Sequence, residues 1–175
     1  MLHLFVDTFA TPTGDMRAVT DENRVLRALE WVSHDNRLHK LLSRQYGAAK
    51  YHLEDHPEHA INIRQNINRY FDGDFNALDT LETKTNGTEF QQEVWAALRT
   101  IPVGKTASYA ELSCMVGRPK AVRAVGLANG ANPIGIVVPC HRVIGANGTL
   151  TGYGGGLDRK EWLLRHEGAL TGELF

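Results

Sequence analysis

The sequence predicts an α+β protein with a strand-rich first half and a mainly helical second half. Three extended apolar segments open the chain and the helical patterns follow them, which is typical of α+β folds. A polar stretch from Asp79 to Gly87 separates the halves and reads as a linker. With 175 residues, the chain is long enough for two small domains. We therefore expect domains at residues 1–85 and 86–175.

The first half is expected to form a small antiparallel sheet with two helices. Leu2–Val6, Met16–Thr20 and Arg24–Trp31 are β-forming segments separated by turn residues. Apolar residues then recur at helical spacing from Leu38 to Tyr46 and from Ala60 to Phe71. No catalytic constellation is visible in these residues, so we assign this half a supporting role.

Histidines are concentrated in the first half, which raises the question of a metal site. Six of the eight lie there, and His52, His56 and His59 fall at near-helical spacing. A zinc site needs further ligands, and this half contains no cysteine. We expect no metal.

Composition is that of an ordinary globular protein, with 42% hydrophobic and 22% charged residues. No segment approaches the roughly 18 apolar residues of a membrane span, and the N-terminus lacks the basic start of an export signal. Two cysteines, Cys114 and Cys140, suit a reducing compartment. We expect a cytoplasmic protein that does not contact membranes. The net charge is −3 for residues 1–85 and +2 for residues 86–175, which permits an anionic partner for the second half without requiring one.

Two capping boxes mark helix starts in the second half. Thr88–Gln91 precedes apolar residues that recur at helical spacing as far as Ile101, and Ser108–Glu111 opens a short helix that stops at Gly117. Pro119 suits the first position of a further helix. Two short helices around a glycine-containing turn indicate a helix-turn-helix.

The helix after Pro119 consists almost entirely of small residues, with Arg123 near its middle. Such a helix can pack tightly against a neighbouring helix. Alternatively, it can enter a DNA minor groove, which is only about 6 Å wide. In the second case Arg123 would fill or open the base stack.

An apolar segment, Ile134–Val138, is expected to form a buried strand that ends at Pro139. Cys140 and His141 follow it directly. A thiol beside an imidazole has the materials of an activated nucleophile. The alternative is a half-buried structural cysteine next to a surface histidine.

Three segments, Pro139–Gly145, Gly152–Leu157 and Lys160–Gly168, resemble in sequence and order the O6-alkylguanine-DNA alkyltransferases, or methylated-DNA–protein-cysteine methyltransferases. The similarity extends back through Phe90–Gly117 and Arg123–Gly126, so it covers the second half. The first half resembles the family's ribonuclease-H-like N-terminal domain more loosely. The bacterial constitutive type, without a fused transcription-factor domain, is the most similar.

The resemblance implies direct DNA repair without a cofactor. The alkyl group of O6-alkylguanine, and of O4-alkylthymine, would move irreversibly to Cys140, so that one protein molecule repairs one lesion. The lesion would have to be flipped out of the duplex first. The implied partner is double-stranded DNA containing alkylated guanine, bound through the minor groove with little sequence preference. We expect a monomer.

The resemblance also implies a catalytic role for each matching residue. Cys140 would accept the alkyl group, His141 would deprotonate the thiol through a water, and Glu167 would orient the imidazole. Tyr109 would donate a proton towards the leaving guanine. Asn132 would tie the recognition helix to the active-site strand.

The implied DNA contacts lie in the helix-turn-helix, where Arg123 would take the place of the flipped nucleotide. The other positions expected to contact DNA are Ser108, Tyr109, Ala124 and Gly126. The guanine pocket is expected to be lined by Trp95, Val143, Tyr153, Gly154 and Gly155. Some relatives place a serine where this chain has Gly154, which predicts a roomier pocket that accepts groups larger than methyl.

Two other functions remain as alternatives. A helix-turn-helix regulator with a redox-sensing cysteine would need side chains that read the major groove, and its second helix offers only Arg123. A cysteine hydrolase using Cys140 and His141 would turn over esters or peptides, whereas alkyl transfer is stoichiometric.

Overall fold

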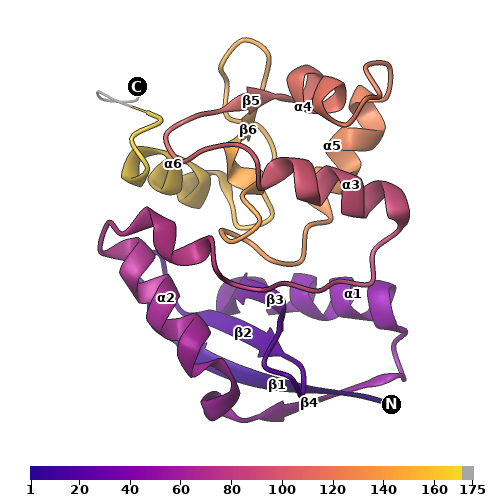
Figure 1. Ribbon diagram of the computed structural model, residues 1–175, viewed down its shortest axis with the longest axis vertical. Helices are drawn as coiled ribbons and strands as arrows, with labels where there is room; N and C mark the ends of the chain where they lie inside the picture. The colour runs from indigo at the N-terminus through magenta and orange to yellow at the C-terminus, as the bar shows by residue number, and fades with distance from the viewer. Residues whose placement is uncertain (171–175) are drawn as a thin grey trace. The chain divides into compact units, whose positions relative to one another are not determined.

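The computed structural model describes residues 1–170, which form two compact units (Figure 1). One unit comprises residues 1–87 together with 133–137, and the other comprises 88–132 and the residues from 138 onward. The predicted α+β class is confirmed. Among the described helices, none has the length and apolar character needed to cross a membrane.

The first unit is built on a four-stranded sheet, drawn in indigo and purple in Figure 1. Its elements are β1 (Leu2–Phe9), β2 (Met16–Thr20), β3 (Leu26–Trp31), α1 (Asp35–Tyr46), β4 (Tyr51–Asp55) and α2 (Ile61–Phe71). The strand order is β3-β2-β1-β4. β1 and β3 both pair antiparallel with β2, but β4 pairs parallel with β1. The prediction of a wholly antiparallel sheet was wrong at this edge, because α1 returns the chain to the end of the sheet at which β1 starts.

The core of this unit lies between α1 and one face of the sheet. Leu38 and Leu42 are buried on α1 and form a cluster with sheet residues. Their partners are Leu4, Val6, Val19 and Ala28. The apolar stripe that predicted this helix is therefore the surface that packs on the sheet.

A buried ion pair closes the turn between β2 and β3. Asp21 Oδ1 accepts hydrogen bonds from the backbone amides of Asn23 (2.9 Å) and Val25 (3.1 Å). Its Oδ2 accepts from Arg27 Nε at 2.8 Å, and Arg27 Nη1 donates to the Tyr46 hydroxyl at 3.0 Å. Burial opposes ionisation of Asp21, but the bonds from Arg27 and the backbone amides lower its pKa.

Two histidines of the first unit, His56 and His59, pack against the ring of Phe5 and against each other. His59 stacks on Phe5 with ring centroids 3.9 Å apart, and His56 meets both rings edge-on. Throughout residues 1–170, no group of three or more His, Cys, Asp or Glu side chains is placed to hold a metal ion.

The second unit is mainly helical. Its elements are α3 (Glu89–Leu98), β5 (Ala107–Ser108), α4 (Tyr109–Met115), α5 (Val122–Gly130), β6 (Val143–Ile144) and α6 (Leu157–His166). Both predicted capping boxes are confirmed: Gln91 N donates to Thr88 Oγ1 at 3.1 Å, and Glu111 N donates to Ser108 Oγ at 3.0 Å. β5 and β6 pair in parallel as a short ladder.

The third predicted helix starts later than expected. We placed Pro119 at its first position, but α5 begins at Val122. The amide of Ala121 donates to the carbonyl of Arg118 at 2.9 Å, so Pro119 lies inside a turn. The prediction was wrong because a proline with its fixed φ also suits the second position of a turn.

The predicted strand at Ile134–Val138 was also wrong. Its only ladder contact within the described residues is an isolated bridge between Ile134 and Leu29. Ile136 has a φ of +68°, which takes the chain out of the extended region, and a run of turns follows. The segment is nevertheless buried. Its apolar composition predicted burial correctly and conformation incorrectly.

Candidate active site

Cys140 and His141 lie on a single 3₁₀ turn, Cys140–Arg142. The turn is fixed from both sides: Cys140 N donates to Val138 O at 2.8 Å, and Arg142 N donates to Pro139 O at 3.0 Å. Cys140 retains 7% exposure and His141 none. The cysteine therefore lies at the edge of the interior, with the imidazole enclosed beside it.

Asn132 supports this turn from the end of α5. Its side chain is buried, and Nδ2 donates to the carbonyl of Val138 at 2.8 Å. The same carbonyl accepts the amide of Cys140. One carbonyl thus links the end of α5 to the backbone of the cysteine, the connection expected of Asn132.

Glu167 reaches His141 across 26 positions of sequence. It follows directly after α6, and its Oε2 lies 2.8 Å from His141 Nε2. An ionised carboxylate only accepts hydrogen bonds, so the neutral imidazole must carry its proton on Nε2. Nδ1 makes no hydrogen bond within the described residues. The ring therefore has an unused acceptor on the side away from Glu167.

Arg142 holds the same carboxylate. Its Nε donates to Glu167 Oε1 at 2.8 Å and its Nη2 to Oε2 at 3.1 Å, while Nη1 donates to Ile101 O at 2.6 Å. This fork fixes the plane of the carboxylate as well as its charge. Burial opposes ionisation of Glu167, but His141 and Arg142 hold its pKa well below the usual range.

His141 remains neutral in this environment. Burial lowers the pKa of its imidazole, Glu167 opposes that effect, and the positive charges of Arg142 and Lys160 add to it. A neutral imidazole with an unoccupied Nδ1 is able to take a proton, which an imidazolium cannot do. The arrangement supplies a base next to a thiol.

Lys160 brings a buried cation to the same place. Its side chain has no exposed surface, and Nζ donates to the carbonyls of Val143 and, at 2.8 Å, Thr151. Burial lowers the pKa of Lys160 to about 8, and the electrostatic interaction with Cys140 works in the opposite direction. At neutral pH the ammonium is still mostly charged, and a nearby cation favours the thiolate.

Sequence reasoning missed Arg142 and Lys160, although a signal for Lys160 was present. Leu163 and Leu164 are the buried apolar residues of α6, and Lys160 and Glu167 complete the i, i+3, i+4, i+7 pattern with them. A lysine on the buried stripe of a helix needs a local reason. Arg142 gave no such signal, because its partners come from distant segments.

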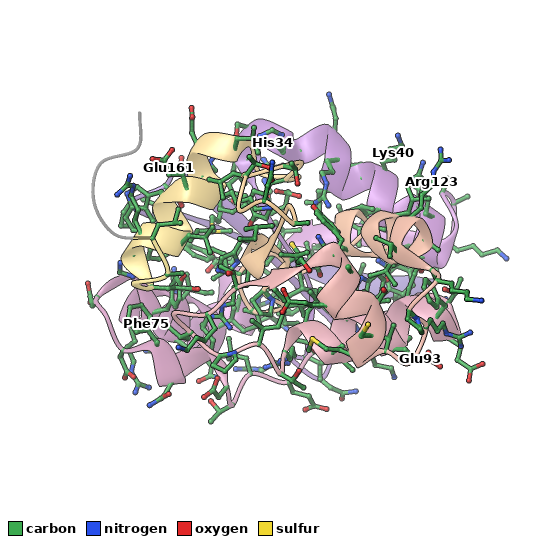
Figure 2. All side chains as sticks on the ribbon, turned by 90° about the horizontal axis from the view of Figure 1, so that it is seen from above. His34, Lys40, Phe75, Glu93, Arg123 and Glu161 are labelled. Carbon is green, nitrogen blue, oxygen red and sulfur yellow. The ribbon has the colours of Figure 1, made fainter. Side chains whose placement is uncertain are left out.

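The residues predicted to contact DNA lie on α4, α5 and the residue before α4. Ser108 caps α4, and Tyr109 is its first residue. A Cβ at Gly126 would lie 3.6 Å from Tyr109 Cδ1, so α5 passes close to this ring. Arg123 and Ala124 are exposed on α5, and Figure 2 labels the Arg123 side chain there.

The predicted pocket residues fall into two groups. Val143 is buried on β6 and accepts the bond from Lys160, and the Tyr153 ring stands edge-on to His141 with centroids 6.4 Å apart. Gly154 and Gly155 continue the Tyr153 segment. Trp95 Nε1 donates to the Ala128 carbonyl at 2.8 Å and so attaches α3 to α5. The structure brings Val143 and Tyr153 into the surroundings of Cys140; the pocket itself stays a prediction.

Comparison with known proteins gives a consistent result. Residues 89–169 match the family model of the 6-O-methylguanine DNA methyltransferase DNA-binding domain. Over 170 residues the chain is 52% identical to the methylated-DNA–protein-cysteine methyltransferase of Salmonella typhimurium, covering 97% of this chain and 99% of the relative. The chain belongs to the methylated-DNA–protein-cysteine methyltransferase family. The protein of that name from Shigella flexneri is 50% identical over the same proportions.

Solved structures of this family share the fold. The structure of Mycobacterium tuberculosis OGT in complex with DNA has a TM-score of 0.75 at 40% identity, covering 96% of this chain and 94% of that one. The segment that matches the family model contains every member of the buried cluster around Cys140. The family match and the cluster described above thus occupy the same part of the chain.

Proposed function

We propose that this protein repairs alkylated DNA directly, by transferring the alkyl group of O6-alkylguanine to its own Cys140. The relatives' name, methylated-DNA–protein-cysteine methyltransferase, and the DNA-bound M. tuberculosis structure support this function. The observation that carries the assignment to Cys140 is the buried chain of groups beside it: a neutral imidazole bonded at 2.8 Å to a carboxylate that Arg142 holds ionised. A structural cysteine would not need such a neighbour.

The transfer is an in-line displacement at the alkyl carbon. The Cys140 thiol loses its proton to Nδ1 of His141 through a bridging water, and the thiolate attacks the carbon attached to O6. The S–C bond forms as the C–O bond breaks. Glu167 stabilises the imidazolium that results, and the Lys160 ammonium stabilises the thiolate before attack. An unperturbed thiol, with a pKa of about 8.5, is mostly protonated at neutral pH and reacts slowly.

Guanine leaves with the electron pair of the broken C–O bond. Tyr109 is proposed to donate its phenolic proton to the departing base, so that no oxyanion is released. The imidazolium of His141 then loses its proton to solvent, and the Tyr109 phenolate takes one up from solvent. The S-alkyl product is a thioether, and its alkyl group could be removed only by a nucleophile that displaces the Cys140 thiolate, which is a poor leaving group, so each molecule is proposed to act once.

Access to the lesion requires base flipping, since an alkyl carbon inside a duplex cannot meet a sulfur of the protein. We propose that α5 enters the minor groove and that exposed Arg123 replaces the flipped nucleotide, with Ser108, Ala124 and Gly126 near the backbone. Cys140 has only 7% exposure. The glycine-rich segment 152–156 lies next to His141, because the Tyr153 ring contacts the imidazole. We therefore propose that this segment moves aside when the base enters.

Further properties follow from this substrate. We propose that the protein works in the cytoplasm, where it would meet lesions in chromosomal DNA. One protein molecule acts on one lesion and carries a complete set of the proposed groups, so a monomer suffices. O4-alkylthymine presents the same alkyl–oxygen bond and is proposed as a second substrate. The redox-sensing regulator is not favoured, because the exposed face of α5 offers Arg123 alone among long polar side chains.

Mass spectrometry tests the proposal. The protein is incubated with a duplex that contains O6-methylguanine, and the peptide that carries Cys140 is analysed. We expect one methyl group on Cys140, an equal amount of restored guanine, and no second turnover with excess DNA. A methyl group on Cys114, or catalytic release of methanol, would contradict the proposal; the latter would favour a hydrolase.

A further inference from the structure

The exposed face of α5 carries an unusual apolar residue, Leu127. Among residues 1–170, six large hydrophobic side chains are exposed, and three of them, Met115, Val122 and Leu127, lie in the α4–α5 segment. Leu127 is 71% exposed. Single exposed leucines are common on protein surfaces. Leu127 is different, because it lies on the helix proposed to contact DNA, where an exposed apolar side chain would meet the bases.

The position of Leu127 relative to Arg123 defines what it would meet. The two residues are four apart on one helix, so they share a face. Four residues of α-helix rise about 6 Å, a little less than two base-pair steps of about 3.4 Å. The other exposed positions of α5 include Ala124 and Gly130, so Leu127 projects beyond neighbours that have almost no side chain.

The minor groove distinguishes base pairs by one group. A G·C pair places the 2-amino group of guanine in the groove as a hydrogen-bond donor, whereas an A·T pair presents only acceptors there and leaves the floor unobstructed. A leucine pressed against a G·C pair would cover that donor and give it no acceptor. Against an A·T pair it would meet no donor that needs an acceptor.

We propose that Leu127 is a specificity-determining residue that makes repair faster when the lesion is flanked by A·T pairs than when it is flanked by G·C pairs. The inference rests on the proposed function and on α5 lying in the minor groove. It modifies the expectation of little sequence preference: the preference concerns the 2-amino group within two steps of the lesion, on the side that Leu127 faces. DNA is the occupant, since Arg123 on the same face supplies the cation that such a groove attracts.

Single-turnover repair of four duplexes tests this proposal. Each contains one O6-methylguanine, with two flanking pairs on either side that are A·T, G·C, inosine·C or 2,6-diaminopurine·T. Inosine removes the minor-groove amino group from a G·C-like pair, and diaminopurine adds it to an A·T-like pair. We expect wild type to repair the two amino-free duplexes faster than the two amino-bearing ones by about tenfold.

Leu127→Ala is the decisive variant, and Ile61→Ala is its matched control, an exposed apolar residue on α2 of the first unit. In Leu127→Ala the ratio between amino-free and amino-bearing flanks should approach one, whereas Ile61→Ala should keep the wild-type ratio. Alkylation by free O6-benzylguanine should be equal in all three proteins, because it involves no groove.

Three results would overturn the inference. They are a wild type indifferent to the amino group, a Leu127→Ala variant that keeps the preference, and an equal loss on all four duplexes. If the proposed function itself were wrong, the result would be different: Cys140 of the wild type would not be methylated by any of the four duplexes.

Discussion

Within residues 1–170, each unit contains one arginine–carboxylate pair in which both side chains are buried. The two pairs differ in the groups, besides the arginine, that donate hydrogen bonds to the carboxylate. Asp21 accepts hydrogen bonds from Arg27 and also from backbone amides of its own turn. Glu167 accepts hydrogen bonds from Arg142 and also from the ring of His141. Both carboxylates have lowered pKa values despite burial.

The comparison shows that a buried ion pair by itself does not indicate a functional site. The Asp21 pair ends on groups that cannot change protonation at physiological pH, and it closes the β2–β3 turn. The Glu167 pair ends on an imidazole next to a thiol. The difference that matters is therefore which group, besides the arginine, donates to the carboxylate: backbone amides in the case of Asp21, and an imidazole beside a thiol in the case of Glu167.

Replacement of the nucleophile should have the largest effect. Cys140→Ala should abolish alkyl transfer, because no other group in the buried cluster can form the S–C bond. It should still bind lesion-containing duplex, since the sulfur is not a phosphate contact. Cys114→Ala, which changes the exposed cysteine of α4, should repair normally. Gel-based transfer of a labelled methyl group measures both, and retained transfer in Cys140→Ala would refute the assignment.

Replacing each carboxylate by the corresponding amide distinguishes the roles of the two ion pairs. Glu167→Gln should slow transfer by about a hundredfold, in the range expected when a positioned base is lost. Asp21→Asn should leave the transfer rate unchanged while lowering stability. Stopped-flow repair and denaturant unfolding on both variants provide the measurement. Equal slowing by the two substitutions would mean that Glu167 acts only by holding the fold.

Lys160 should contribute less than Glu167. Lys160→Met keeps the length of the buried side chain but removes the cation beside the sulfur, and we expect transfer at neutral pH to slow by about tenfold. Lys40→Met, on the exposed surface of α1, is the matched control and should have no effect. A Lys160→Met variant with the wild-type rate at every pH would remove the ammonium from the mechanism.

The stability of the protein at acid pH should depend on the two buried carboxylates, Glu167 and Asp21. A carboxylate whose pKa is lowered on folding stabilises the protein above its unfolded value, near 4.5 for Glu167, and that contribution is lost as the pH falls further. Wild type should therefore lose stability below about pH 4.5, and Glu167→Gln should lose less over the same interval. Asp21→Asn should flatten the curve at lower pH, since its ordinary value is 3.8. Thermal unfolding as a function of pH tests both.

The pocket substitution should have the smallest effect. Gly154→Ser adds a hydroxyl donor and removes space, so transfer from O6-benzylguanine should slow several-fold while transfer from O6-methylguanine changes little. The ratio of the two rates is the measurement. A wild type with strict methyl preference, unaltered in Gly154→Ser, would count against a roomier pocket.

Sequence alone predicted those parts whose cause is local. The two capping boxes and the amphipathic helices depend on residues three and four positions apart, and the structure confirms them. Strand β4, Tyr51–Asp55, was missed because its charged residues do not have a strand's usual composition. This strand forms because it pairs in parallel with β1. Ile134–Val138 had a strand's composition, but its ladder pairing within residues 1–170 is the isolated bridge to Leu29.

The site residues also fall into those that the sequence indicated and those that depend on distant contacts. The Cys140–His141 pair is visible as a dipeptide, and Glu167 was reached through family resemblance. Arg142 was missed because its partners, Glu167 and the carbonyl of Ile101, lie 25 and 41 positions away. The carbonyls that Lys160 binds are equally invisible, since any residue could supply them. Contacts that depend on backbone groups of distant segments leave no mark on composition.

The central claim is that Glu167, through His141, makes Cys140 reactive. The most direct test is the rate at which Cys140 is alkylated by free O6-benzylguanine as a function of pH in wild type, Glu167→Gln and Asp21→Asn. We predict that wild type and Asp21→Asn share one profile and remain reactive at neutral pH, whereas Glu167→Gln becomes reactive only at distinctly higher pH. A Glu167→Gln profile that coincides with that of wild type would contradict the account.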